Sequence, residues 1–283
     1  SDHDAIKTII AQQLNLQNND FDFIIKKRSV DARQRPVKYV LKVEVFHNEQ
    51  IPEKKYTISA YENVSDKPSV IIVGSGPAGL FAALKCLENK LKPIVLERGK
   101  NVRDRRRDLA KIHKEHVVNS ESNYCFGEGG AGTYSDGKLY TRSTKRGHVQ
   151  EVLELLVQHG ASEDILIDAH PHIGTNKLPQ IIQSIRETII NSGGEVHFDS
   201  KVVDFIIEKN QIKGVVLEDG KEFLSKNVIL ATGHSARDIF YLLHKKNIEI
   251  EFKPFALGVR IEHSQELIDE LQYKLNPRGE FLP

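Results

Sequence analysis

The feature that most constrains the fold is a short apolar strand that leads directly into a glycine-rich turn. The strand covers residues 70–73, and Gly-x-Gly-x-x-Gly follows at residues 74–79. A helical pattern comes next, and a second apolar strand then ends in Glu97, with seventeen residues between Gly79 and this acid. This order is typical of a βαβ unit that binds an adenine dinucleotide.

Each position of the turn has a predicted role. Gly74 permits the tight turn out of the strand, and the missing side chain of Gly76 lets the backbone approach a pyrophosphate. Gly79 allows the helix to pack closely, and the helix start offers N–H groups and a positive dipole end to phosphates. Glu97 is placed to accept hydrogen bonds from the ribose hydroxyls. We therefore predict a dinucleotide site, against the alternative of a chance glycine-rich turn.

Short strands late in the chain indicate which dinucleotide is bound. Strands are predicted at residues 196–198, 202–208, 212–217 and 228–230, with turns at Asn210 and at Asp219 and Gly220. The last strand ends in Ala231-Thr232-Gly233. This order resembles the FAD-binding domain of the glutathione-reductase-like flavoproteins. The resemblance implies that the turn holds the ADP half of FAD, that the backbone of Val202 holds the adenine, and that Ala231-Thr232-Gly233 passes close to the cofactor.

A second glycine-rich segment narrows the resemblance. Five glycines fall between residues 127 and 137, within the run Cys-Phe-Gly-Glu-Gly-Gly-Ala-Gly-Thr-Tyr-Ser-Asp-Gly-Lys that begins at residue 125. With Glu97-Arg98-Gly99 and Arg-Arg-Arg-Asp at 105–108, it resembles the bacterial family of FAD-dependent dehydrogenases over almost the whole chain. The family implies FAD and an oxidoreductase activity, and leaves the substrate open. Members are longer, so the chain looks truncated at its C-terminus.

The predicted fold class is α/β with three parts. A small α+β N-terminal domain covers residues 1–66, with a helix at 5–16 and strands at 21–26 and 38–46. A Rossmann-like FAD-binding domain with an antiparallel β-meander covers 67–236 and includes helices at 150–159 and 180–191. An incomplete substrate domain covers 237–283, with a strand at 252–262.

The cofactor site is predicted from these motifs. Ser135 and Lys138 are expected to face a phosphate or the flavin, and the alternative is a mobile surface loop. Arg98 is expected on the adenosine side. The predicted cofactor-binding residues are Gly74, Ser75, Gly76, Pro77, Ala78, Gly79, Glu97, Arg98, Gly129, Gly130, Ala131, Gly132, Ser135, Lys138, Val202, Ala231, Thr232 and Gly233.

The reacting groups are less defined. No catalytic residue is predicted, although His234 is a candidate proton donor, with a structural histidine as the alternative. Cys125 has no Cys-x-x-Cys partner and is interpreted as a structural or incidental thiol, with a redox thiol that faces the flavin as the alternative. The histidines, including His170 and His172, form no metal signature, so no metal is predicted.

Composition restricts the function further. The 283 residues carry a net charge of +1, which gives no reason to expect nucleic acid or a membrane as a partner. The two cysteines fit a reducing cytoplasm. Residues 26–38 and 98–114 are locally basic and are interpreted as solvated faces, with attraction of RNA or an acidic partner as the alternative.

These observations favour a cytoplasmic FAD-dependent oxidoreductase. It would pass hydride or electrons between a small-molecule substrate and an electron donor that the sequence does not identify. The alternative is a flavoprotein-derived binding module whose basic N-terminal unit contacts RNA or an acidic protein.

Overall fold

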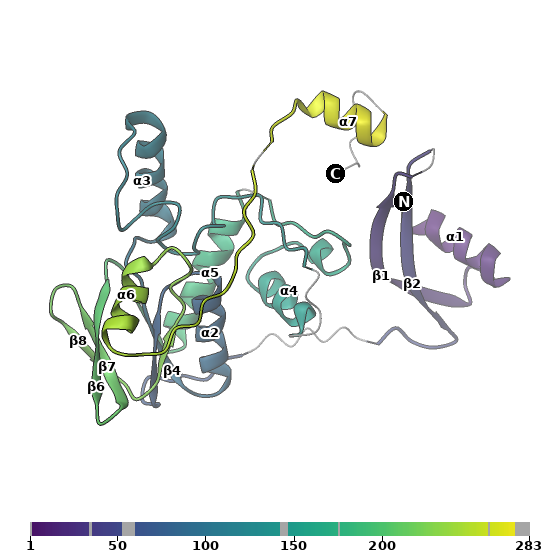
Figure 1. Cartoon of the computed structure of the whole chain (residues 1–283). Coiled ribbons are helices and arrows are strands. Elements are labelled where there is room, and N and C mark those ends of the chain that lie inside the picture. The colour runs from purple at the N-terminus through teal and green to yellow at the C-terminus, as the bar shows by residue number, and fades with distance from the viewer. Residues whose placement is uncertain are drawn as a thin grey trace.

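The centre of the molecule is a four-stranded parallel sheet (Figure 1). The computed structural model describes residues 2–33, 36–52, 60–141, 147–174, 176–259 and 261–274. The strands, in spatial order, are β5 (Glu195–His197), β4 (Lys92–Leu96), β3 (Ser69–Val73) and β9 (Val228–Leu230). β3 and β4 are nearly continuous buried apolar runs, as expected for parallel strands that are covered on both faces.

Two different layers cover the sheet. Helices α2 (Pro77–Glu88) and α5 (Leu178–Asn191) pack on one face, where they share a core with Ile72 and Val95. The antiparallel meander of β6 (Val202–Glu208), β7 (Gln211–Leu217) and β8 (Glu222–Leu224) packs on the other face, against Ile71 and Leu96. Successive residues of each central strand therefore belong to opposite cores. The α/β class with a parallel sheet and an antiparallel meander is confirmed.

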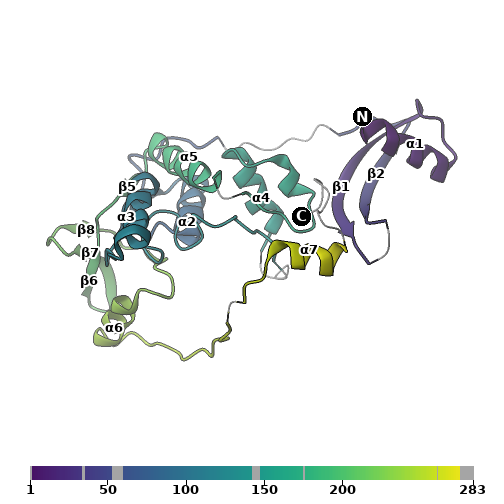
Figure 2. The same ribbon diagram turned by 90° about the horizontal axis from the view of Figure 1, so that it is seen from above.

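The N-terminal unit is a helix on a hairpin. α1 (Asp2–Leu14) packs on β1 (Phe21–Asp31) and β2 (Lys38–His47). Figures 1 and 2 show this unit on the far side of α4 (Val149–Gln158) from the parallel sheet. The backbone N–H of Arg28 donates to Ile167 O at 2.7 Å, and Ala169 N–H donates to Arg28 O at 2.9 Å. The guanidinium of Arg28 also pairs with Asp168, with Nε 2.7 Å from Oδ1.

Irregular segments connect the helices on one side of the sheet. α3 (Val102–Glu115) leads into a long glycine-rich loop, residues 119–139, and α4 is followed by the short 3₁₀ helix η1 (Glu163–Leu166). The end of the loop pairs with the segment after η1, because Leu139 N–H donates to Pro171 O at 2.9 Å and Ile173 N–H donates to Gly137 O at 3.1 Å. These bonds fix the C-terminal end of the loop.

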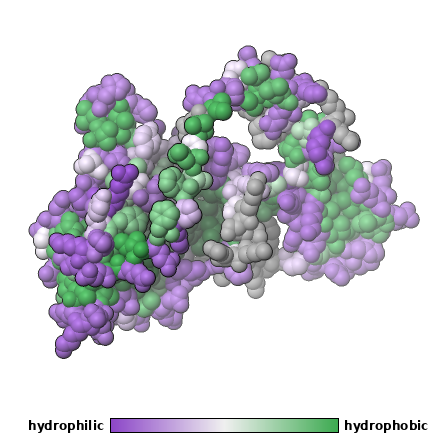
Figure 3. All heavy atoms as spheres, viewed as in Figure 1, coloured by the Kyte–Doolittle hydropathy of each residue, from purple (hydrophilic) through white to green (hydrophobic). Residues whose placement is uncertain are grey.

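The C-terminal part corrects one prediction. α6 (Arg237–Lys245) packs against β6, and an extended segment, residues 249–259, then leads toward α7 (Gln265–Tyr273) (Figure 1). We call residues 249–259 the C-terminal arm. The prediction of a strand at 252–262 is wrong for this arm. The arm has the alternating apolar pattern of a strand but pairs with no strand in the described residues. Its side chains remain exposed, at 81% for Phe255 and 89% for Leu257, and Figure 3 shows hydrophobic atoms along it.

The other predicted elements are present, most of them with shifted ends. The first helix begins at Asp2 rather than at residue 5, and the first strand continues to Asp31 rather than ending at 26. No helix among the described residues has the length and apolar character needed to cross a bilayer.

Candidate functional site

The turn after β3 has the geometry that its three glycines predict. Gly74 has φ +106°, and a Cβ on it would lie 2.5 Å from Ala231 O. A Cβ on Gly79 would lie 1.9 Å from Gly74 O, so α2 begins directly against the turn. At Gly76 the nearest atom to such a Cβ would be the Cα of Gly130, at 3.9 Å. Side chains are therefore excluded by the protein itself at residues 74 and 79, whereas Gly76 faces open space.

The start of α2 is suited to an anion. Its N-cap is Gly76, so no side chain caps the first N–H groups of the helix, and Pro77 occupies the first helical position. The first backbone N–H groups of a helix have no partner within the helix, and the dipole places partial positive charge beside them. This end of α2 can therefore bind a phosphate group.

Glu97, at the end of β4, connects the turn to the glycine-rich loop. Its Oε2 accepts hydrogen bonds from the backbone N–H and the hydroxyl of Ser75, both at 2.8 Å. Its Oε1 accepts from Gly99 N–H at 2.9 Å and from Gly127 N–H at 3.0 Å. The carboxylate points toward the turn. It also has a structural role that the sequence analysis missed, because it fixes three separate backbone segments.

Arg105 of α3 holds the glycine-rich loop in place. It is fully buried and donates to the carbonyl oxygens of Asn123 at 2.9 Å, Tyr124 at 3.2 Å and Glu128 at 2.7 Å. A further bond reaches Thr133 Oγ1 at 3.1 Å. For this residue the interpretation of 98–114 as a solvated basic face is wrong. The guanidinium group donates hydrogen bonds to several carbonyl groups of the loop, which have no partner in a sheet or helix.

A second buried ionisable residue, Glu128, belongs to the loop itself. Its Oε2 accepts from Val102 N–H, at the start of α3, at 2.7 Å and from Arg186 Nη1, on α5, at 2.9 Å. Burial raises the pKa of Glu128 to about 6, because removing the carboxylate from water disfavours its charged form. Its Oε1 is buried and has no hydrogen-bond partner among the described residues.

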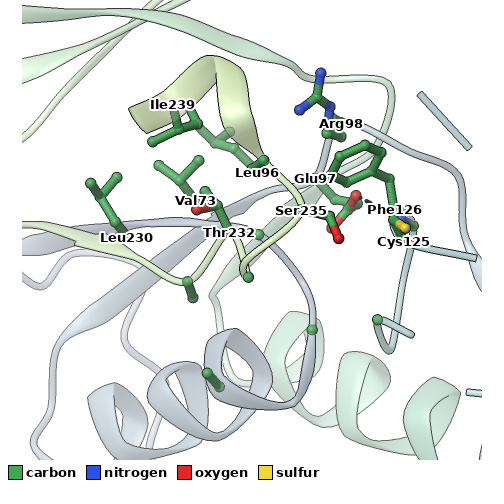
Figure 4. A pocket seen from close by; sticks show the side chains of 18 of the residues that line it. Val73, Leu96, Glu97, Arg98, Cys125, Phe126, Leu230, Thr232, Ser235 and Ile239 are labelled. Carbon is green, nitrogen blue, oxygen red and sulfur yellow. Dashed lines mark hydrogen bonds between the residues drawn. The ribbon is translucent and has the colours of Figure 1, made fainter. Parts of the chain in front are cut away.

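A cavity of about 370 Å³ lies between the turn, the glycine-rich loop and the start of β6. This volume falls in the range of small-molecule sites. Figure 4 shows Val73, Leu230 and Ile239 toward one end of the cavity and Glu97 and Phe126 toward the other. The predicted site residues that line it are Gly74, Gly76, Pro77, Ala78, Glu97, Arg98, Gly130, Ala131, Val202, Ala231, Thr232 and Gly233.

Some predicted residues lie outside the lining. The hydroxyl of Ser135 donates to Gly132 O at 2.7 Å, and Lys138 Nζ is exposed and lies 3.3 Å from Asp136. These side chains do not face the cavity, because the loop turns away to pair with residues 171–174. The predicted residues outside the lining are Ser75, Gly79, Gly129, Gly132, Ser135 and Lys138.

An ionic network surrounds the end of the cavity near β6. Arg98 Nε donates to Glu121 at 2.6 Å, and Arg98 Nη1 donates to Asp238 at 3.0 Å. The guanidinium carbon of Arg98 lies 4.3 Å from the centre of the Phe126 ring. Lys201 Nζ also reaches Glu121, at 3.1 Å. The Arg98 side chain is thereby fixed at this end of the cavity, and its contact with an adenosine stays a prediction.

Several lining residues were not predicted as cofactor contacts. His234 and Cys125, both weighed for chemistry, do line the cavity. Ile239 reaches it because α6 begins soon after the end of β9, a position that the apolar pattern of α6 could have indicated. The other unpredicted lining residues are Val73, Leu96, Phe126, Gly127, Ser200, Lys201, Leu230, Ser235 and Ala236. No group of three or more potential metal ligands occurs in the part of the chain that the structure describes.

Three family profiles match parts of the chain. A family described as "FAD binding domain" matches residues 69–105, which contain the turn and Glu97. "Glucose inhibited division protein A" matches residues 180–273, and "Domain of unknown function (DUF8436)" matches residues 1–46. The matches over residues 69–105 and 180–273 indicate a domain of the FAD/NAD(P)-binding flavoprotein superfamily.

Similar proteins extend this comparison. An uncharacterized protein of Clostridium beijerinckii is 38% identical over 293 residues, which cover 97% of this chain and 54% of the relative. The tRNA uridine 5-carboxymethylaminomethyl modification enzyme MnmG of Alkaliphilus metalliredigens is 43% identical over 61% of this chain and 25% of its own length. Thiamine thiazole synthase of Methanococcus maripaludis is 24% identical over 70% of this chain and 68% of its own length. The chain thus spans about half the length of the Clostridium relative.

Among solved structures, THI4 of Thermovibrio ammonificans matches with a TM-score of 0.43 and 16% identity, over 64% of this chain and 63% of that chain. Thioredoxin reductase of Lactococcus lactis matches with a TM-score of 0.31 and 20% identity, over 59% of this chain and 36% of that chain.

Proposed function

We propose that this chain is the cofactor-binding part of an FAD-dependent oxidoreductase. The observation that carries the proposal is the open space at Gly76, where a glycine turn, an uncapped helix start and Gly130 of the loop border one cavity. This arrangement provides backbone N–H groups and room for a pyrophosphate without a side chain between them. Gly74, Gly76 and the start of α2 would hold the pyrophosphate, and Glu97 the ribose.

Two features favour FAD over a nicotinamide dinucleotide. The antiparallel meander β6–β8 follows the parallel strands β3, β4 and β5, where a nicotinamide-binding domain would continue to alternate strands and helices. The first residue of the meander, Val202, lines the cavity beside Ser200 and Lys201. The family that matches residues 69–105 is an FAD binding domain. Bound FAD would supply hydride or electron transfer. The chain's own residues would bind and orient it, and His234 could hold a proton at the cavity wall.

The C-terminal arm supports a further part of this proposal. Val259 is 88% exposed and, like Phe255 and Leu257, belongs to the alternating apolar side of the arm. Apolar residues at every second position are typical of a strand with one buried face. The arm would bury this apolar side in a substrate domain, which would place a small-molecule substrate against the cofactor.

The alternative of a basic binding module is weakened because three of the described basic residues in 26–38 already have acidic partners. Arg28 pairs with Asp164 and Asp168, Arg33 with Asp31 and Lys26 with Glu44. Residues 34 and 35 of this basic segment lie outside the described residues. The paired cations offer less free positive charge to RNA than the sequence count indicates.

Titration of the purified protein with FAD tests the proposal. Gly76→Ala should fold normally, since the nearest atom to its methyl group is the Cα of Gly130 at 3.9 Å, which is an ordinary contact. The methyl group would, however, occupy the space that a phosphate needs. We expect quenching of flavin fluorescence to show at least tenfold weaker binding, equivalent to about 1.4 kcal/mol. Gly132→Ala is the matched control, because it lies in the glycine-rich loop but outside the cavity and has room for a Cβ. Equal FAD affinity of both variants would contradict the assignment.

Thiol alkylation gives an independent readout. Cys125 is exposed and lines the cavity, whereas Cys86 is buried in α2, where burial raises the pKa of its thiol. FAD or ADP should therefore slow the alkylation of Cys125 by iodoacetamide, as followed by peptide mass spectrometry. Cys86 serves as the internal unreactive control. Unchanged alkylation of Cys125 at saturating FAD would place the cofactor elsewhere.

A further inference from the structure

A second cavity lies on the other side of the glycine-rich loop. Its volume is about 680 Å³, and it is bounded by α3, the loop and the start of α5. Tyr124 lines this cavity, whereas the next two residues, Cys125 and Phe126, line the dinucleotide cavity. The loop is therefore a wall between two separate cavities, and the proposed function uses only one of them.

The charge of the second cavity is positive. Arg106 lines it, is exposed and forms no ion pair among the described residues. Its neighbours on α3 differ, because Arg105 is buried under the loop and Arg107 pairs with Asp104. No carboxylate lines the described part of the cavity. An anion in this cavity would therefore be attracted by Arg106, and no carboxylate of the described lining would repel it.

The cavity also presents aromatic rings. The hydroxyl of Tyr134 donates to Val102 O, and its ring lies 5.5 Å from the guanidinium carbon of Arg105. The hydroxyl of Tyr124 lies 2.6 Å from His113 Nε2. Both tyrosines line the cavity, and their polar ends already have partners within the protein. What they can offer a ligand is therefore apolar ring surface, which favours a planar molecule.

We propose that this cavity binds a small anion that carries a planar ring, with Arg106 paired to the anionic group and Tyr124 and Tyr134 against the ring. The amide side chains of Asn176, just before α5, and of Gln180, in its first turn, would hydrogen-bond to polar atoms of the ligand. An aromatic carboxylate and a nucleoside monophosphate share this chemistry. The site does not depend on FAD and is separate from the proposed function.

Calorimetric titration of the 283-residue chain tests the site with four probes. Benzoate and AMP represent the two ligand sources, whereas benzamide lacks the charge and acetate lacks the ring. We expect benzoate or AMP to bind saturably, and benzamide and acetate to bind at least tenfold more weakly. AMP also suits the dinucleotide cavity, so the titration is repeated in Gly76→Ala, where binding to the second cavity should persist. Equal binding of benzamide and benzoate, or no saturable binding of benzoate or AMP in Gly76→Ala, would overturn the proposal.

Variants on α3 locate the binding. Arg106→Gln should lower the affinity for the bound probe at least tenfold and keep the fold, since this side chain has no ion pair to lose. Arg103→Gln is the matched control, because Arg103 is exposed on the same helix and does not line the cavity, and its affinity should stay within twofold of wild type. Tyr124→Ala should also weaken binding. Equal affinities of Arg106→Gln and Arg103→Gln would show that the anion binds elsewhere.

Discussion

The glycine-rich loop and the C-terminal arm are both extended and irregular, yet their environments are opposite. The loop has its backbone hydrogen bonds satisfied by buried side chains, chiefly Arg105 and Glu97. The arm is exposed and makes no strand pairing in the described residues. In the loop, hydrogen bonds from buried charged side chains fix a backbone that belongs to no helix or sheet. In the arm, alternating apolar residues alone do not form a sheet.

The largest effect on stability is expected when the guanidinium group of Arg105 is replaced. Arg105→Lys keeps the charge but cannot reach the same set of carbonyl oxygens, so buried acceptors lose their donors. We expect the free energy of unfolding in urea to fall by about 3 kcal/mol. Arg107→Lys, whose partner Asp104 is exposed, should change it by less than about 0.5 kcal/mol. Equal stability of these variants would mean that the loop does not depend on Arg105.

A smaller effect should follow the titration of Glu128. Its folded pKa of about 6 lies above the ordinary 4.5, so the folded protein binds the proton more tightly than the unfolded chain. The contribution of Glu128 to stability is therefore full below pH 4.5 and is lost as the pH rises through about 6. Between these limits, wild type should lose on the order of 2 kcal/mol relative to Glu128→Gln, at about 1.36 kcal/mol per pKa unit.

Urea unfolding of both proteins from pH 4.5 to 7 measures this difference. The groups that face Glu128 are Arg186, Arg105, Glu97 and the N–H of Val102. Glutamine keeps an acceptor for Val102 and removes the titration. Parallel stability curves for the two proteins would mean that Glu128 has an ordinary pKa.

The smallest effect is expected in the arm. Leu257→Ala should change the free energy of unfolding by less than about 0.5 kcal/mol, because the side chain is already 89% exposed. Leu84→Ala, the same substitution at a fully buried position of α2, should cost about 2–5 kcal/mol. A clear loss of stability in Leu257→Ala would show that the arm has a partner in solution.

The sequence predicted the fold where the signals are local. The strands predicted at residues 202–208 and 228–230 have the observed bounds, because apolar runs and turn residues define them directly. The turn glycines could also be interpreted from sequence, since each role depends on the strand and helix next to it. The ribose contact of Glu97 and the other cofactor contacts stay predictions.

The sequence could not reveal contacts that depend on distant segments. Nothing distinguishes Arg105 from its neighbours Arg106 and Arg107, yet only the fold places it under carbonyl groups 18 to 23 residues away. The pairing of Glu128 with Arg186 spans 58 residues. The strand predicted in the arm failed for the same reason, because a strand needs a partner that its own residues do not specify.

The bond between Arg28 and the segment after η1 has a consequence for how this protein can be recombined. Residues 1–46 match a family of their own, so they could be replaced as one segment by the equivalent segment of another protein. Their anchor, however, is shared with Asp164 and Asp168, far downstream of any junction placed between the two units. A chimera that imports a foreign N-terminal segment should dock only if these two acids are matched to it.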